Sequence, residues 1–190
     1  MKLLFGTNNP HKLEEVRAIM PEGIEIFSLA DLGIQMDVEE TETTFVGNAF
    51  LKARAFHQAA GIPCFADDSG LIIDALDGRP GVYSARYGGP GCTHEDNIQK
   101  VLGELEGISK RTARFKALIA YVDGENEQTF EGIVEGTILT EKVGTEGFGY
   151  DPIFQPEGYD ISFAQMDSAE KNRISHRGKS LAKLVAYFRG

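Results

Sequence analysis

In the first part of this chain, apolar residues occur in two kinds of pattern that alternate. One is a short continuous run, and the other is the spacing of one face of a helix. The runs at residues 2–6 and 24–27 predict short buried strands. Between them, Leu13, Val16 and Met20 recur at the spacing of one helix face. We therefore expect a strand, a helix and a second strand, in that order.

The same alternation continues toward the C-terminus, with a hairpin added in the second half. Asp123-Gly124 starts the short connection between two long β-like segments, which is typical of a hairpin. Because strands and helices alternate early and a hairpin comes late, we predict an α/β fold with a long mixed sheet flanked by helices. Further strands are expected at residues 62–66, 71–76, 112–122 and 128–139, and further helices at 46–60, after Thr93, at 168–173 and at 178–188.

Length and composition limit the class of protein. The 190 residues are 42% hydrophobic and 25% charged, which suits one globular domain, residues 1–190, with no separable linker. No apolar run approaches the roughly 20 residues of a membrane-spanning helix, and the N-terminus does not resemble a secretory signal. Cys64 and Cys92 do not form a disulfide framework, so we expect a cytoplasmic protein without a membrane partner.

The charge balance narrows the choice of partners. The formal net charge is −10, from 29 acidic and 19 basic residues. Such a chain repels the phosphate backbone of nucleic acids, so we do not expect a nucleic-acid partner. A small phosphorylated substrate remains compatible with this charge, because a few placed cations and a divalent metal can bind it.

Asp67, Asp68, Ser69 and Gly70 follow an apolar run, and we interpret them as a turn at the carboxyl end of a strand. Ligands bind at this edge in open α/β sheets. Oxygen-rich sites suit Mg²⁺, which binds through one or two carboxylates plus substrate phosphates. The alternative interpretation is an Asx turn that only reverses the chain.

Residues 7–12 form the predicted turn from the first strand into the first helix. Free N–H groups at a helix start attract anions, and a Lys in the first turn strengthens a phosphate site. A capped helix with a solvated Lys is the alternative. The candidate binding residues in this turn are Thr7, Asn8, Asn9, Pro10, His11 and Lys12.

Asn48 and Lys52 lie four residues apart on the next predicted helix and therefore share a face. We expect this face to point toward the acidic loop that carries Glu39 and Glu40. Solvated helix polarity is the alternative interpretation. A role for Lys52 at a phosphate becomes attractive only if other motifs converge nearby.

Residues 147–152 combine flexible backbone with Phe148 and Tyr150, which suits a wall for a flat base. Anchoring of the loop in the core is the alternative. His176 and Arg177 offer a ring and a planar fork that can hydrogen-bond and stack on a base.

Two other features receive no function in this interpretation. Residues 178–180 imitate the end of a P-loop, but Arg173 occupies the position of the required upstream Gly. His57 and His94, like His11, are interpreted as surface histidines.

Taken together, these segments resemble the inosine triphosphate pyrophosphatase family, the XTP/dITP diphosphatases, nearly from end to end. Two positions depart from the family pattern. Asn8 stands where the family has Gly, and Asn also tolerates left-handed backbone geometry. Gly47 stands where an acidic residue is common. The matching segments are residues 7–12, 39–53, 65–71, 80–87, 147–154 and 175–178.

The resemblance implies a fold of two lobes around a long mixed sheet with a central cleft, and a homodimer. It also implies a reaction in which a non-standard purine nucleoside triphosphate (dITP, ITP or XTP) and water give the monophosphate and pyrophosphate, with Mg²⁺ required. Such an enzyme removes abnormal nucleotides from the nucleotide pool.

On this hypothesis the chemistry is shared among three groups of residues. Asp68 is the general base and a metal ligand, and Lys52 acts beside it. Asp67 and either Glu39 or Glu40 help to hold Mg²⁺. Lys12, Lys52 and Lys171 neutralise the triphosphate, Thr7, Asn9 and Ser69 donate hydrogen bonds to it, Phe148 and Tyr150 flank the base next to Gly149, and Asp151, His176 and Arg177 read its edge.

Two rival functions remain open at this point. One is a nucleotide pyrophosphatase of related fold that acts on dTTP or UTP. The other is a regulatory module that binds a nucleoside triphosphate without hydrolysing it.

Overall fold

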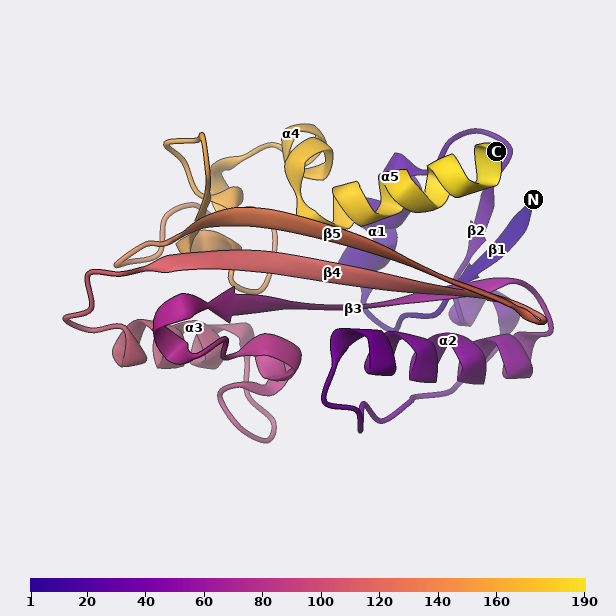
Figure 1. Ribbon diagram of the computed structural model, residues 1–190, viewed down its shortest axis with the longest axis horizontal. Coiled ribbons are helices and arrows are strands. Elements are labelled where there is room, and N and C mark those ends of the chain that lie inside the picture. Colours follow the sequence, from indigo (N-terminus) through magenta and orange to yellow (C-terminus); the bar gives the residue numbers. More distant parts are fainter. The chain divides into compact units, whose positions relative to one another are not determined.

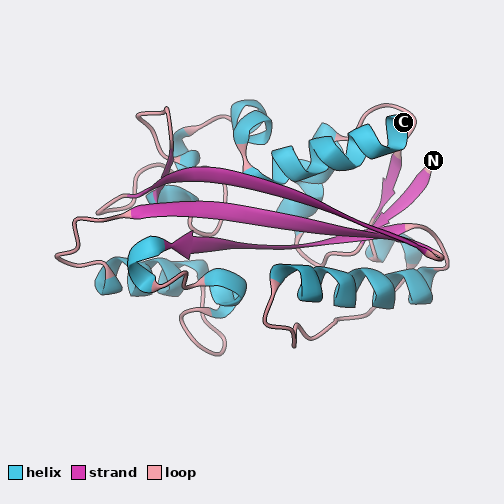
Figure 2. Ribbon diagram, viewed as in Figure 1, coloured by secondary structure: helices cyan, strands magenta, loops and turns pink.

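The computed structural model describes residues 1–190, and its order of elements follows the predicted alternation (Figure 1, Figure 2). The long strands β4 and β5 form the predicted hairpin. The strands are β1 (Lys2–Phe5), β2 (Glu25–Phe27), β3 (Cys64–Ile73), β4 (Thr112–Asp123), β5 (Asn126–Ile138) and β6 (Phe154–Pro156). The helices are α1 (Pro10–Ile19), α2 (Phe45–Ala60), α3 (His94–Glu104), α4 (Ser168–Ile174) and α5 (His176–Arg189).

The six strands form one sheet in the order β2-β1-β3-β4-β5-β6. Strand β1 pairs in parallel with both β2 and β3, whereas β5 pairs antiparallel with β6. The prediction of a mixed sheet in an α/β fold is therefore confirmed.

Helix boundaries follow from capping residues that the sequence supplies. Asn9 caps α1 ahead of Pro10 at the first helical position, and Thr44 caps α2 by accepting from the Gly47 amide. Helix α2 ends at Gly61, whose φ of 68° is the left-handed conformation that favours glycine. These caps fix where the side chains of each helix point.

Two compact units divide the chain. One comprises Met1–Asp68, Ala117–Gly132 and Arg177–Gly190, and the other comprises Ser69–Lys116 and Ile133–His176. We call them the N-terminal unit and the middle unit. The boundaries separate Asp68 from Ser69 and His176 from Arg177, so neighbouring candidate residues belong to different units. The predicted central cleft stays a prediction.

In the N-terminal unit, helices cover both faces of the sheet (Figure 1). Helix α2 packs Ala49 and Ala53 against the small strand residue Ala66 on one face. Helices α1 and α5 cover the opposite face, where Phe65 stacks on Phe5 with ring centroids 4.6 Å apart. Consecutive residues of β3 thus face different helices, as the pleat of a strand requires.

The middle unit has its own core, built around aromatic rings. Phe115 on β4 packs against Phe154 and Phe163, at centroid distances of 4.6 and 6.0 Å. Ile98 and Val101 of α3 join the same cluster. This core supports the segments on either side of β6.

The prediction of a turn at residues 67–70 is wrong, because β3 runs through them without a break. Gly70 makes this possible, since a Cβ there would lie 2.2 Å from the Gly81 carbonyl oxygen and 2.6 Å from the Ser84 Oγ. Ser84 in turn accepts from the Leu71 amide at 2.9 Å. Glycine in a strand often marks such a close approach of another backbone. The two aspartates consequently lie inside the sheet, not at its edge.

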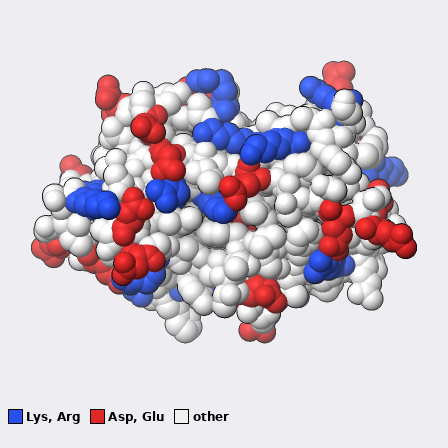
Figure 3. Space-filling view, viewed as in Figure 1, with Lys and Arg blue, Asp and Glu red and all other residues white.

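Charged side chains of both signs occupy the surface. Lys and Arg side chains lie among Asp and Glu side chains on the face drawn in Figure 3, so the negative charge is not gathered into one continuous patch there. No helix of the chain is long and apolar enough to cross a membrane.

Candidate active site

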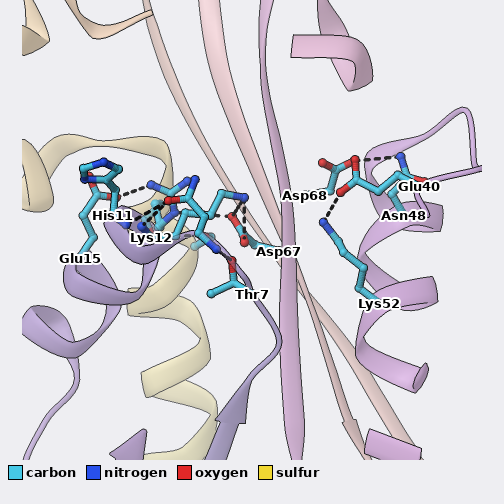
Figure 4. Close-up of polar contacts among 12 residues, drawn as sticks. Thr7, His11, Lys12, Glu15, Glu40, Asn48, Lys52, Asp67 and Asp68 are labelled. Carbon is cyan, nitrogen blue, oxygen red and sulfur yellow. Dashed lines mark hydrogen bonds and ion pairs between the residues drawn. The ribbon is translucent and has the colours of Figure 1, made fainter. Parts of the chain in front are cut away.

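Strand β3 directs Asp67 and Asp68 to opposite sides (Figure 4). Both side chains are buried, with 2% and 4% of their surface exposed. Asp67 faces residues from α1, and Asp68 faces residues from α2 and the acidic loop before it. Each carboxylate therefore has its own set of charged neighbours.

Asp68 is held by the first turns of α2. Asn48 is buried, and its Nδ2 donates to Asp68 Oδ2 at 3.2 Å. Its Oδ1 accepts from the Glu42 amide at 3.0 Å, which ties the acidic loop to the helix. One turn later, Lys52 forms an ion pair with Glu40. The structure thus gathers Asp68, Asn48, Lys52 and Glu40, whereas Glu39 is exposed.

The surroundings of Asp68 make its carboxylate a base near neutral pH. Burial raises the pKa of Asp68 to about 6, with a further rise from the charge of Glu40 and opposition from Lys52. Burial lowers the pKa of Lys52, but Asp67, Glu40 and Asp68 outweigh it and leave that pKa raised. Asp68 is consequently ionised at pH 7 at an energetic cost, beside a cation that stays charged.

Asp67 belongs to a buried ion-pair network on the other side of β3. Lys12 Nζ lies 3.1 and 3.0 Å from the two carboxylate oxygens of Asp67. Arg177 Nε approaches Asp67 Oδ2 at 3.5 Å, and Arg177 also pairs with Glu15. Burial would raise the pKa of Asp67, but Lys12, then Arg177 and Lys52, hold it well below the usual value. Asp67 is therefore a fixed negative charge.

The same charged neighbours act on the pKa of Lys12. Burial lowers its pKa, and the charges of Arg177 and Lys52 lower it further, against the raising effect of Asp67. The other two cations have carboxylate partners of their own, Glu15 for Arg177 and Glu40 for Lys52. Cations and carboxylates are therefore combined in one network in this part of the N-terminal unit.

The predicted turn at residues 7–12 is present and is organised by its own side chains. Asn9 Oδ1 accepts from the amides of His11 and Lys12 at 3.0 and 3.3 Å, and Thr7 Oγ1 accepts from the Asn9 amide at 3.1 Å. Pro10 occupies the first helical position. The turn therefore presents a rigid helix start next to Lys12.

Asn8 does not use the left-handed backbone geometry that its position suggested, since Asp77 is the one non-glycine residue with positive φ. Its side chain makes tertiary contacts instead. Asn8 Nδ2 donates to the Met36 carbonyl at 3.2 Å and to Asp37 Oδ1 at 3.4 Å. The substitution of Gly by Asn thus ties the turn to the segment before the acidic loop.

A pocket of about 490 Å³ lies beside the same turn, between residues 7–10 and residues 28–35. Its lining contains hydroxyl, amide and apolar side chains and no Lys or Arg. Because a triphosphate needs cations, we do not expect the phosphates to bind in this pocket.

In the middle unit, residues 147–151 form a tight loop, which we call the aromatic loop. Asp151 closes it, because its Oδ2 accepts from the Phe148 amide at 2.9 Å and from Lys171 Nζ at 2.8 Å. Lys171 Nζ also lies 4.9 Å from the centroid of the Phe148 ring. We expected Lys171 among the phosphate-binding lysines, but in the structure it contacts the aromatic loop.

Of three other predicted site residues, two are buried and one is half-buried. Tyr150 is buried in the core and donates its hydroxyl to the Ser84 carbonyl at 2.7 Å, which is the anchoring role left open as the alternative. His176 is buried and stacks on Phe115 with ring centroids 4.8 Å apart. Ser69 is half-buried.

His94 is exposed, as predicted for a surface histidine, whereas His57 is half-buried, and both rings contact distant parts of the chain. The His57 ring contacts the Ile62 carbonyl at 2.7 Å and accepts from the Gly124 amide at 3.2 Å. His94 accepts from the Gly149 amide of the aromatic loop at 3.3 Å. The sequence contained no signal for these long-range contacts.

Sequence reasoning also gave no role to Glu15, and it left Asn48 outside the predicted set of site residues. Both are recoverable from helical spacing, since Glu15 follows Lys12 by three positions and Asn48 precedes Lys52 by four. No group of three or more His, Cys, Asp or Glu side chains is arranged to hold a metal ion in residues 1–190. Asp68 and Glu40 are close enough for the charge of Glu40 to raise the pKa of Asp68.

Comparison with known proteins identifies the family of the chain. A model of the Ham1 family matches residues 3–187. A dITP/XTP pyrophosphatase of Flavobacterium psychrophilum is 47% identical, with 100% of both chains covered. One of Bacillus subtilis is 50% identical, with 95% of this chain and 93% of the relative covered.

Solved structures agree with the sequence comparison. The Ham1 protein of Staphylococcus aureus matches with a TM-score of 0.90 and 38% identity, covering 100% of this chain and 99% of that one. A nucleoside-triphosphatase / dITP/XTP pyrophosphatase of Mycobacterium abscessus matches with a TM-score of 0.78 and 40% identity, covering 97% and 99%. The resemblance inferred from the sequence is confirmed, and the chain belongs to the Ham1 family.

Proposed function

We propose that this protein hydrolyses the non-standard purine nucleoside triphosphates dITP, ITP and XTP to the monophosphate and pyrophosphate. The observation that carries the proposal is Asp68, a buried carboxylate with a pKa raised to about 6, held beside Lys52. The names of relatives at 47% and 50% identity, dITP/XTP pyrophosphatases, support the choice of substrate.

Asp68 is the general base of this reaction. Its carboxylate takes a proton from water, and the water oxygen forms a bond to the α-phosphorus. The bond from the α-phosphorus to the oxygen that bridges to the β-phosphorus breaks, and pyrophosphate leaves with that oxygen. A base with a pKa near the working pH suits this proton transfer. Asn48, which donates to Asp68 Oδ2, keeps the carboxylate oriented.

Lys52 and Lys12 bind the negative charge of the triphosphate. Lys52 stays protonated because Asp67, Glu40 and Asp68 raise its pKa. Lys12 lies in the first turn of α1, where the helix dipole favours negative charge.

Asp68 and Glu40 are the residues that would hold Mg²⁺. Glu40 raises the pKa of Asp68, and a cation shared by two such carboxylates removes their mutual repulsion. Two carboxylates fit this ion, which completes its coordination with phosphate oxygens and water. Asp67 fits less well, because it points to the opposite side of β3 from Asp68 and Glu40 (Figure 4). When bound, the ion supplies positive charge to the phosphate oxygens in the transition state.

The aromatic loop is proposed to bind the base. Phe148 offers a ring face, and Lys171 beside it offers a donor to the 6-oxo group of hypoxanthine or xanthine. Adenine carries an amino group there, and a buried donor left unpaired costs about 1–3 kcal/mol. Arg177 was the predicted donor; it is engaged by Glu15 and Asp67, as Lys171 is by Asp151, but Lys171 lies against the Phe148 ring.

We also propose that the protein acts as a homodimer in the cytoplasm. The homodimer rests on the family resemblance alone, and the cytoplasmic location rests on the two free cysteines. Sedimentation equilibrium of the purified chain tests the first, with a mass twice the 20.8 kDa of one chain expected.

A substrate panel tests the proposed reaction. Pyrophosphate release is measured with Mg²⁺ from ITP, dITP, XTP, GTP, ATP and dTTP, each with an EDTA control and with Asp68→Asn as the matched inactive variant. Metal-dependent release from ITP, dITP and XTP is expected. A preference for dTTP would favour a pyrimidine enzyme, release of orthophosphate would place the cleavage elsewhere, and binding without turnover would favour a regulatory module.

A further inference from the structure

The first turn of α3 is fixed rigidly at its N-terminal end. Thr93 and Asp96 form a reciprocal capping box, in which the Thr93 amide donates to Asp96 Oδ2 at 2.7 Å and the Asp96 amide donates to Thr93 Oγ1 at 3.2 Å. His94 is the first residue of the helix that follows. Its backbone is therefore held in one conformation.

From this position His94 reaches the aromatic loop. The Gly149 amide donates to His94 Nδ1 at 3.3 Å. The His94 ring also lies near the Phe148 ring, with centroids 6.4 Å apart and planes tilted by 39°. Because Nδ1 accepts a hydrogen bond here, the neutral ring must carry its proton on Nε2.

A second contact joins the same helix turn to the chain ahead of the loop. Glu95 Oε2 accepts from Lys142 Nζ at 2.6 Å, and Glu95 Oε1 accepts from Gln99 one turn later. Two consecutive residues of α3 thus contact the chain segment that leads into the aromatic loop and the loop itself.

The aromatic loop needs such anchors, because two of its residues are glycines in left-handed conformations. Gly147 and Gly149 have φ angles of 73° and 61°. Glycine gives up the most conformational freedom on being ordered, so a loop that contains it is soft unless it is tied. Asp151 holds the Phe148 amide, and His94 holds the next amide along the chain.

We infer that His94 is a positioning residue that holds the aromatic loop in its base-binding conformation. The inference rests on the proposed function, in which Phe148 contacts the base. His94 acts through the backbone of Gly149 and does not touch the substrate. Its loss is expected to weaken binding of the base more than it slows the chemistry at Asp68.

Two substitutions separate the hydrogen bond from the ring. His94→Phe keeps an aromatic ring and removes the acceptor, whereas His94→Asn places an oxygen acceptor at nearly the position of Nδ1. We expect His94→Phe to raise KM for dITP about 3–10-fold with kcat within twofold, the size of effect of one hydrogen bond. His94→Asn should restore most of the wild-type KM.

His57→Phe is the matched control, because it also removes an imidazole acceptor from a glycine amide, that of Gly124. It should leave KM for dITP unchanged. Thermal unfolding of each variant establishes that the compared proteins are folded. An unchanged KM in His94→Phe, or the same rise in His57→Phe, would overturn the inference.

Nitrogen-15 NMR of the imidazole rings in the ligand-free protein tests the contact without any substrate. An unprotonated His94 Nδ1 whose resonance responds to Gly149→Ala supports the inference, and a protonated Nδ1 in the neutral ring would overturn it. If the wild type releases no pyrophosphate from dITP, the proposed function fails, and this measurement still decides whether His94 holds the loop.

Discussion

Asp67 and Asp68 are adjacent in the chain and equally buried, yet their environments are opposite. Asp67 is surrounded by Lys12, Arg177 and Lys52, which hold its pKa well below the usual value. Asp68 meets Lys52 but also Glu40, and burial raises its pKa to about 6. The pleat of β3 produces this contrast by sending the two side chains to different faces.

The contrast teaches that charge balance, not the residue type, divides structural from chemical carboxylates. Asp67 is compensated and therefore stabilises the N-terminal unit as an anion. Asp68 is only partly compensated, so it is available to accept a proton or to share a cation. Functional groups held at such an energetic cost are typical of active sites.

The largest effect is expected on catalysis when Asp68 is replaced. Asp68→Asn removes the base while preserving the shape of the side chain. We expect kcat for pyrophosphate release from dITP to fall about 10²–10⁴-fold, the range for loss of general base catalysis. Turnover within tenfold of the wild type would show that Asp68 is not the base.

The next effect concerns stability on the Asp67 face. Asp67→Asn leaves Lys12 and Arg177 buried without their shared anion. Breaking a buried pair by removing one partner costs about 3–5 kcal/mol, which urea unfolding at pH 7 can measure. Glu127→Gln breaks the exposed ion pair with Arg54 and serves as a control, with an expected cost of at most about 1 kcal/mol. Equal costs for the two variants would contradict the assignment of Asp67.

Asp68→Asn is expected to increase the free energy of unfolding, whereas Asp67→Asn decreases it. The increase is smaller than that decrease. The folded pKa of Asp68, about 6, exceeds the ordinary value of 3.8, so its ionisation destabilises the fold. Relative to the Asn variant, the wild type loses stability as pH rises from 4 through 6, and the difference is constant above that. In EDTA at pH 7.5 the variant should be about 1–3 kcal/mol more stable. A variant that is less stable there, or a difference independent of pH, would contradict the raised pKa.

The smallest effect sharpens the role of Asn48. Its hydrogen bond lowers the pKa of Asp68, so Asn48→Ala should raise it. The acidic limb of the pH profile of kcat/KM is expected to move upward by about 0.4–1 unit, the equivalent of the roughly 0.5–1.5 kcal/mol that one ordinary hydrogen bond contributes. A profile identical to that of the wild type would remove Asn48 from the account.

Local signals in the sequence predicted much of the fold. Asn9-Pro10 and Thr93 mark helix starts by their capping chemistry, and Asp123-Gly124 marks the hairpin. The continuity of β3 through residues 67–70 escaped prediction, because Asp, Ser and Gly favour turns when considered alone. The strand continues because partners far along the chain meet it, such as Ser84 against Gly70.

The site shows the same limit. Asp68 and Lys52 were predicted by residue type and spacing, but the choice of Glu40 over Glu39 depends on how the acidic loop lies against α2. The pairing of Lys171 with Asp151 and the contact from His94 to Gly149 depend on tertiary packing. Residue types therefore predict which chemistry is present, and long-range contacts determine which side chains are brought together to perform it.

The contrast between the two carboxylates can be measured directly by carbon-13 NMR of aspartate side chains, titrated in metal-free protein with Asp67→Asn and Asp68→Asn for assignment. The account predicts that the Asp68 carboxyl titrates near pH 6, whereas the Asp67 carboxyl stays ionised until the protein unfolds in acid. Titration of both groups together near pH 4 would contradict it.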